Sequence, residues 1–136
     1  ENLQELWSTL KMSKSIPDSA IFITDSPDEI ERKLKKAFCP EKELEFNPVI
    51  DWCKYLIFPN QKRLEVKRPD KFGGDKTYSS FKELAEDFKR GELHPMDLKA
   101  ATAEGLTKLL EPARKHFSQP KQKKMLQDME KLLITR

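Results

Sequence analysis

The chain has 136 residues, which is the size of one ordinary domain and too few for two full enzyme domains. Its 26 Lys and Arg against 23 Asp and Glu give a net charge of +3, and charged residues make up 36% of the sequence, a balance typical of a soluble globular domain. No stretch approaches the roughly 20 consecutive apolar residues of a membrane span, and no secretory signal is visible, so we expect neither a membrane nor a secreted protein. The two cysteines and two histidines are widely spaced and predict a reducing, cytoplasmic compartment without a structural metal.

The first third of the sequence predicts two helices joined by a loop and a short extended run. Apolar residues recur at helical spacing over residues 3–10, and the polar pentapeptide KMSKS follows at 11–15. The run AIFIT at 20–24 is β-prone. The segment SPDE at 26–29 then supplies an N-cap, a proline in the first turn and a capping-box glutamate for a helix that extends to about residue 38.

The middle of the chain predicts a buried helix followed by a β-hairpin. Asn47 and Pro48 repeat the cap-then-proline signal before the run VIDWCKYLIF, whose apolar face is too wide for one stripe and predicts burial on most sides. The large side chains of this run that we expect in the core are Trp52, Tyr55, Leu56 and Phe58. Alternation at 64–68 and a returning segment at 76–78 predict two short antiparallel strands, with the tip KFGGD at 71–75.

The last part of the chain predicts three helices. A second capping box, SFKE at 80–83, begins a helix that stops at Gly91. The dipeptide HP at 94–95 begins another helix, in which Pro112 should introduce a kink or end a segment. Residues 121–133 predict a final, basic helix.

The loop at 11–15 carries two ammonium groups and two hydroxyl groups, all able to reach phosphate oxygens. Such groups stabilise developing negative charge, and a mobile loop lets them engage late in a reaction. An ordinary solvated turn has the same composition, because Lys and Ser are common in loops. The residues alone leave both interpretations open.

Two further segments combine groups that suit an unpaired nucleobase. Phe72 lies on the glycine-flexible tip, where its ring can stack on a base or return to the core. Asp97 lies in the first turn of a predicted helix, where a carboxylate complements the helix dipole and also matches the N1 and N2 donors of guanine. His94 can contact the same base. An acid–base pair of His94 and Asp97 is discounted, because nothing else in the chain supplies a nucleophile.

Six segments of the sequence, in this order, resemble the tyrosyl-tRNA synthetases of archaea and eukaryotes, which are class I aminoacyl-tRNA synthetases. They cover residues 11 to about 117 and read KMSKSIPDSAIF, DSPDEIERKLKKAFCP, KRPDKFGGD, KTYSSFKELAEDF, GELHPMDLKAATAE and LLEPARKHF. KMSKS is the second signature of class I. A tryptophanyl-tRNA synthetase fragment is the nearest alternative, although the tryptophanyl enzymes share the lysine loop without the FGGD and LHPMDLK segments.

The resemblance implies a catalytic role for the lysine loop. In similar enzymes this loop binds ATP phosphates, which assigns Lys11 and Lys14 as catalytic residues. Lys14 is the better candidate for contacting the leaving pyrophosphate. Ser13 and Ser15 are lesser phosphate-binding candidates.

The resemblance also implies an anticodon site. In similar enzymes an aspartate at the corresponding position reads the first anticodon base, guanine, which assigns Asp97 as the reader and Phe72 and His94 as base-packing partners. The weaker candidates for the same site are Met96, Lys99, Cys39 and Pro40.

The fold implied by the resemblance is mainly α, a helical anticodon-binding domain with a small β-hairpin at 26–136. Residues 1–25 would be the edge of a Rossmann catalytic domain with its KMSKS loop. The chain, which begins at Glu1, would then be the C-terminal part of a tyrosine–tRNA ligase that uses ATP with Mg²⁺ to activate tyrosine and transfer it to tyrosine tRNA. The domain upstream would supply the tyrosine pocket and a homodimer surface, and we expect the fragment alone to be inactive.

An alternative from another class is a stand-alone RNA-binding or protein-interaction module, or a helical domain with no partner of its own. Basic runs at 32–36 and 121–124 are typical of solvated helix faces. Beside an anticodon site they would instead neutralise tRNA phosphates, with an affinity that falls as salt rises. The role of residues 118–136 stays open.

Overall fold

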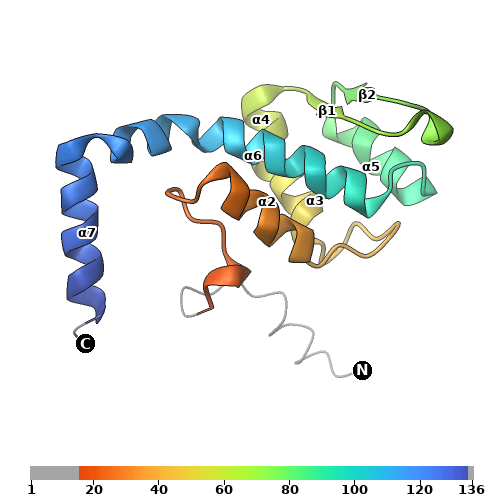
Figure 1. Ribbon diagram of the computed structural model, residues 1–136. Helices are drawn as coiled ribbons and strands as arrows, with labels where there is room; N and C mark the ends of the chain where they lie inside the picture. The colour runs from red at the N-terminus through yellow and green to blue at the C-terminus, as the bar shows by residue number, and fades with distance from the viewer. Residues whose placement is uncertain (1–15, 135–136) are drawn as a thin grey trace.

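The computed structural model describes residues 16–134, with side chains up to residue 132. This part of the chain is mainly helical, with a two-stranded antiparallel sheet (Figure 1). The helix expected at 3–10 and the lysine loop at 11–15 lie outside the described residues. None of the described helices is long and apolar enough to cross a membrane.

The described elements follow the order expected from residue 26 onward. They are η1 (Pro17–Ser19), α2 (Pro27–Lys36), α3 (Pro48–Trp52), the π-helix η2 (Cys53–Ile57), α4 (Phe58–Gln61), β1 (Leu64–Val66), η3 (Asp70–Phe72), β2 (Lys76–Tyr78), α5 (Phe81–Arg90), α6 (Pro95–Ser118) and α7 (Pro120–Ile134). The short elements η1 and η3 are 3-10 turns.

The predicted helix starts and the predicted stop at Gly91 are confirmed. Ser26, Asn47 and Ser80 each accept a hydrogen bond from a backbone amide in the first turn of the helix that follows, which satisfies a donor that has no partner inside the helix. α5 ends at Gly91, whose φ of 82° is a left-handed conformation that glycine adopts without steric cost.

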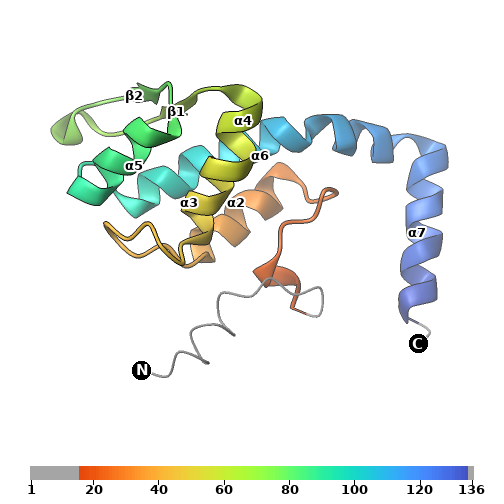
Figure 2. The ribbon, with the colours of Figure 1, turned by 180° about the vertical axis from the view of Figure 1, so that it is seen from behind.

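The long helix α6 forms the centre of the fold. It packs against α2, the α3–α4 segment and β1, and Figures 1 and 2 show the hairpin and α5 near its N-terminal half, with α7 leaving its C-terminal end. The core contains the fully buried side chains of several elements, among them Ile30, Leu34, Ile57, Tyr78, Leu84, Phe88 and Leu98. Burial of this apolar surface is the main stabilising contribution to the fold.

The helix expected after Pro48 is confirmed as a continuous run of α3, η2 and α4 with a π-helical centre. It lies very close to α6 at Gly105, where an added Cβ would come within 2.9 Å of Ile57 Cδ1. Gln61 Nε2 also donates to Gly105 O at 2.7 Å. The glycine that weakens helix propensity in the sequence therefore permits a close helix contact in the fold.

The expected burial of this helix on most sides is wrong. Phe58 is buried and Trp52 is partly buried, but Tyr55 and Leu56 are 63% and 40% exposed. The helix lies on the outside of the fold. Its inner face packs against α6 and its Phe58 against Phe81 of α5, which leaves the outer face exposed. An apolar run does not reveal which of its faces finds a partner.

The β-prone run at 20–24 forms a turn, so the expected extended run is wrong. Phe22 N donates to Asp25 Oδ2 at 2.9 Å, and Asp25 N donates to Phe22 O at 3.0 Å. Lys33 of α2, only 5% exposed, donates to Ala20 O at 2.9 Å and pairs with Asp25 Oδ2 at 2.7 Å. A buried charge requires such partners, and the contacts hold this segment against α2 instead of in a sheet.

Pro112 does not end α6, which continues to Ser118. Proline lacks the amide hydrogen that the carbonyl of Lys108 would otherwise accept, and Figure 1 shows the helix curving along its length. Arg114 Nη2 donates to Thr107 O at 2.7 Å, a side-chain bond that supports the helix beside the proline.

Asp87 of α5 ties the base of the hairpin to the helix. Its side chain is 3% exposed, accepts from Tyr78 OH at 2.9 Å, and is paired with Lys76 of β2 and with Arg90. Burial by itself raises the pKa of this carboxyl, but the hydrogen bonds from Lys76 and Tyr78 outweigh it and hold the pKa below its ordinary value. Burial and the bond to Asp87 raise the pKa of Tyr78 above its usual range.

We expect Asp87→Asn to lower the free energy of unfolding at neutral pH by about 1.5–3 kcal/mol, the range for hydrogen bonds to charged groups. A depressed folded-state pKa gives stability that is complete above the unfolded-state pKa of about 3.9 and is lost as the pH falls through the folded-state pKa. The difference between the two proteins should therefore shrink in acid. Denaturant unfolding from neutral pH downward measures it, with Glu86→Gln, an exposed carboxylate on the same helix, as control. A constant difference at every pH would contradict the assignment.

Candidate nucleic-acid interface

A pocket of about 290 Å³ lies between the hairpin tip and the start of α6. Its volume is just below the roughly 300–1,000 Å³ typical of small-molecule sites, which suits a group of the size of one base. The residues that line it are Pro69, Phe72, Gly91, Glu92, His94 and Asp97. Three of the residues predicted from the sequence, Phe72, His94 and Asp97, therefore come together.

Phe72 forms the hairpin wall of this pocket. Its ring is 60% exposed, so it does not return to the core. The 3-10 turn η3 presents it, because Phe72 N donates to Pro69 O at 2.9 Å and Gly73 follows with a φ of 97°. Lys71 Nζ lies 4.9 Å from the ring centroid. An exposed aromatic face beside a cation can stack on a nucleobase.

His94 stands at the N-cap of α6, on the opposite wall. Its Nδ1 accepts from Met96 N at 3.1 Å, which gives the ring a structural role at the helix start. Because Nδ1 is the acceptor, the hydrogen of the neutral ring is on Nε2, and Nε2 lies 3.4 Å from Glu41 Oε1. The cap bond and the Glu41 contact together hold the orientation of the ring.

Asp97 lies in the first turn of α6, partly buried at the pocket wall. Within residues 16–132, the side chain of Asp97 makes no hydrogen bond and no ion pair. The helix dipole favours a negative charge at this position. The pocket thus presents an acceptor without a donor, opposite an exposed aromatic ring.

The four weaker anticodon candidates do not line this pocket. Met96 is 52% exposed, and Lys99 Nζ donates to a backbone carbonyl of α2 at 3.1 Å. Cys39 is half-buried and accepts from the Asn47 amide at 3.5 Å, and burial raises the pKa of its thiol. Pro40 follows it in the same loop and is partly buried.

Some residues around the pocket were missed by sequence reasoning. Gly91 was interpreted only as a helix stop, yet an added Cβ there would lie 2.5 Å from Lys42 Cε, so the Lys42 side chain crosses the glycine at the pocket edge. Glu41 and Lys42 come from the loop after α2, and no spacing in the sequence relates that loop to His94. Only the tertiary fold brings this loop next to His94 and Gly91.

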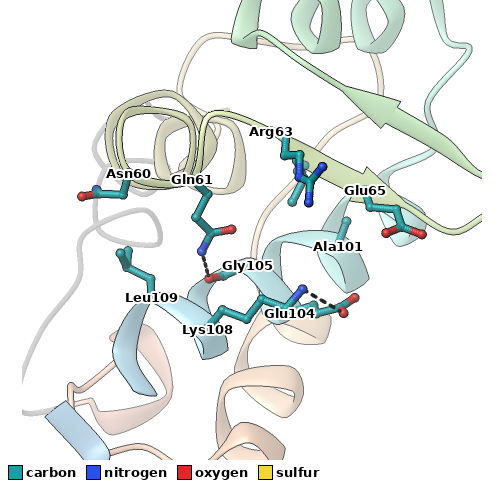
Figure 3. A pocket seen from close by; sticks show the side chains of 10 residues that line it. Asn60, Gln61, Arg63, Glu65, Ala101, Glu104, Gly105, Lys108 and Leu109 are labelled. Carbon is teal, nitrogen blue, oxygen red and sulfur yellow. Dashed lines mark hydrogen bonds and ion pairs between the residues drawn. The ribbon is translucent and has the colours of Figure 1, made fainter. Parts of the chain in front are cut away.

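A larger pocket of about 490 Å³ lies between α4, β1 and α6, and Figure 3 shows its lining. Several of its polar groups already have partners, since Gln61 donates to Gly105 O at 2.7 Å and Lys108 pairs with Glu104 at 3.5 Å. It contains none of the residues predicted to bind a ligand. We therefore assign the candidate site to the smaller pocket at Asp97.

The predicted ATP-phosphate residues Lys11, Ser13, Lys14 and Ser15 lie outside the described residues. Over the described residues, no group of three or more His, Cys, Asp or Glu side chains is placed to hold a metal ion.

The family model described as "tRNA synthetases class I (W and Y)" matches residues 3–111. The tyrosine–tRNA ligases of Thermococcus kodakarensis and Pyrococcus horikoshii are 51% and 52% identical to the whole chain, which spans 36% of the length of each. The chain thus covers about a third of these relatives.

Solved structures of tyrosyl-tRNA synthetases also match this chain over about a third of their own length. The crystal structure of the tyrosyl-tRNA synthetase of Pyrococcus horikoshii complexed with L-tyrosine matches 86% of this chain with a TM-score of 0.74 and 54% identity, over 33% of its own length. That of Aeropyrum pernix matches 88% of this chain with a TM-score of 0.76 and 40% identity, over 35% of its own length. The mainly helical fold with its hairpin corresponds to the C-terminal part of these structures. The chain belongs to the class I tRNA synthetases, in the branch of the archaeal-type tyrosyl-tRNA synthetases.

Proposed function

We propose that the pocket between Phe72 and Asp97 binds the first anticodon base of tyrosine tRNA, a guanine. The observation that carries the proposal is the carboxylate of Asp97, which lines the pocket without a partner in the described part of the chain. Sequence-specific RNA recognition usually stacks an unpaired base on an aromatic ring and bonds its Watson–Crick edge. Phe72 supplies the ring and Asp97 supplies the bonds.

The chemistry of the carboxylate selects guanine among the four bases. An ionised carboxylate only accepts hydrogen bonds, and its two oxygens suit a pair of neighbouring donors. Guanine presents such a pair, N1–H and N2–H, on its Watson–Crick edge. The other bases place an acceptor beside each donor there, which would leave one oxygen of Asp97 facing a lone pair.

The activity proposed for the full-length protein is that of a tyrosine–tRNA ligase, which uses ATP with Mg²⁺ to activate tyrosine and transfers it to tyrosine tRNA. The support is the identity to tyrosine–tRNA ligases over the whole chain. In that protein Lys11 and Lys14 would bind ATP phosphates, and residues 26–136 would be the anticodon-binding domain. Homodimerisation would use a surface upstream of this chain.

We expect Asp97→Ala to lower the affinity for tyrosine tRNA by about 1–3 kcal/mol, by analogy with bidentate base readout in duplexes. Affinity for the same tRNA with its first anticodon base changed should alter little, because that base offers no matching donors. Fluorescence anisotropy with both RNAs, at two salt concentrations, measures the difference. Asp128→Ala, which removes an exposed carboxylate of α7, is the charge-matched control. Equal effects of Asp97→Ala on both RNAs would refute the assignment of Asp97 as reader.

The two roles of His94 can be separated by a pair of substitutions. His94→Asn keeps an N-cap acceptor but removes the ring, whereas His94→Ala removes both, and loss of an N-cap costs about 1 kcal/mol of stability. We expect both variants to bind tyrosine tRNA more weakly and only His94→Ala to be less stable in denaturant unfolding. Unchanged RNA binding by His94→Asn would limit His94 to the helix cap.

Lys123 and Lys124 are exposed on α7 and are expected to contact phosphates only. Replacing either with Ala should weaken binding of every RNA to a similar extent and reduce the slope of log affinity against log salt by about one or less. Titrations of both tRNAs over a salt series measure this slope. A change that depends on the anticodon would show that α7 reads bases.

A further inference from the structure

The β-ladder of the hairpin ends before it reaches Phe72. The two strands pair from Leu64↔Tyr78 to Val66↔Lys76, and Phe72 lies in the connection between Val66 and Lys76. Bonds between the strands therefore cannot set the distance from the Phe72 ring to the α6 wall. Asp87 ties down only the β2 side at the base of the hairpin.

Arg68 makes the connection that the ladder does not. Its Nε donates to Gly74 O at 2.9 Å, on the far side of the tip, and its Nη1 donates to Glu92 O at 2.9 Å, in the turn between α5 and α6. Its backbone amide donates to Asp75 Oδ1 at 3.0 Å. One partly buried guanidinium thus bridges the two segments that carry the opposite walls of the pocket.

Local backbone hydrogen bonds are present at both ends of this bridge. Within the tip, Gly73 N donates to Asp70 O at 3.0 Å and Gly74 N donates to Pro69 O at 3.2 Å. At the other end, Glu92 N donates to Asp87 O at 2.9 Å, which holds the carbonyl-bearing residue against the end of α5. Movement of the tip relative to α6 therefore requires breaking the bonds of Arg68.

We propose that Arg68 is a positioning residue for anticodon recognition, which sets the gap between the Phe72 ring and the Asp97 carboxylate. The inference rests on the proposed function of this pocket. The planar fork of arginine donates along two directions at once, whereas lysine is a flexible point charge. With Nε and Nη1 bonded to backbone carbonyls, Arg68 acts through the shape of the pocket, and the exposed Lys67 and Lys71 are the better candidates for phosphate contacts.

The test compares Arg68→Ala, Arg68→Lys and the neighbouring charge control Lys67→Ala. Binding is measured by anisotropy to tyrosine tRNA and to the same tRNA with a changed first anticodon base. We expect Arg68→Ala to lose the preference for guanine about tenfold or more, since this preference depends on correctly placed bidentate contacts. Arg68→Lys, which keeps the charge without the fork, should recover only part of it. Lys67→Ala should weaken binding to both RNAs equally and leave the preference for guanine intact.

A second measurement tests, without RNA, whether Arg68 restrains the hairpin tip. Hydrogen exchange at the amides of residues 70–75 should be faster in Arg68→Ala than in the unaltered chain, while exchange in α6 stays the same. If Arg68→Ala does not fold, Arg68→Gln, which keeps a single amide donor, takes its place in both measurements.

The outcomes separate this inference from the proposed function. A guanine preference that survives in Arg68→Ala, or one that Arg68→Lys restores completely, would overturn the role of Arg68 while leaving Asp97 as the reader. Unchanged exchange at the amides of residues 70–75 would also overturn the role of Arg68. If the unaltered chain shows no preference between the two RNAs, the proposed function itself fails, and the role of Arg68 in recognition fails with it.

Discussion

The packing of the first turn of α6 into the core is the constraint on which the candidate site depends. Pro95 and Leu98 are buried while Met96 and Asp97 face outward to different extents. The carboxylate therefore stands next in sequence to a residue fully enclosed by the core. A side chain carried by a buried turn is held more accurately than one on a loop, which suits the role proposed for Asp97, matching two donors on one base.

The other wall of the pocket has no such support of its own. The hairpin has two short strands, and a two-stranded sheet is marginal without further packing. Its Tyr78 is fully buried, and its Lys76 and Tyr78 are bonded to Asp87 of α5. Helix α5 therefore stabilises the hairpin, and the chain continues from its end directly into the turn before α6. The polar bonds of the buried Asp87 connect the hairpin to α5, and such bonds are specific in geometry as well as stabilising.

Some features of the fold were accessible from local sequence signals. The three helix starts at Ser26, Asn47 and Ser80 and the stop at Gly91 agree with the structure, because caps are satisfied by residues within a few positions of one another. The extended run at 20–24 and the burial of Tyr55 and Leu56 were wrong for the opposite reason. The contacts of Lys33 determine the conformation of residues 20–24, and the outer position of the α3–α4 helix leaves Tyr55 and Leu56 exposed. Neither feature is visible in a short stretch of sequence.

The sequence by itself determined the family, the helix starts at Ser26, Asn47 and Ser80 and the stop at Gly91. It also predicted the three principal residues of the candidate site, since ordered motifs and capping signals are properties of the chain read locally. Only the tertiary structure decided that Phe72, His94 and Asp97 share one pocket, and that Cys39, Pro40, Met96 and Lys99 do not line it. It also placed Glu41 beside His94 and joined Arg68 to Glu92. These contacts link residues far apart in the sequence, and they exist only because the packing of α2, α5 and the hairpin around α6 brings their backbones within reach.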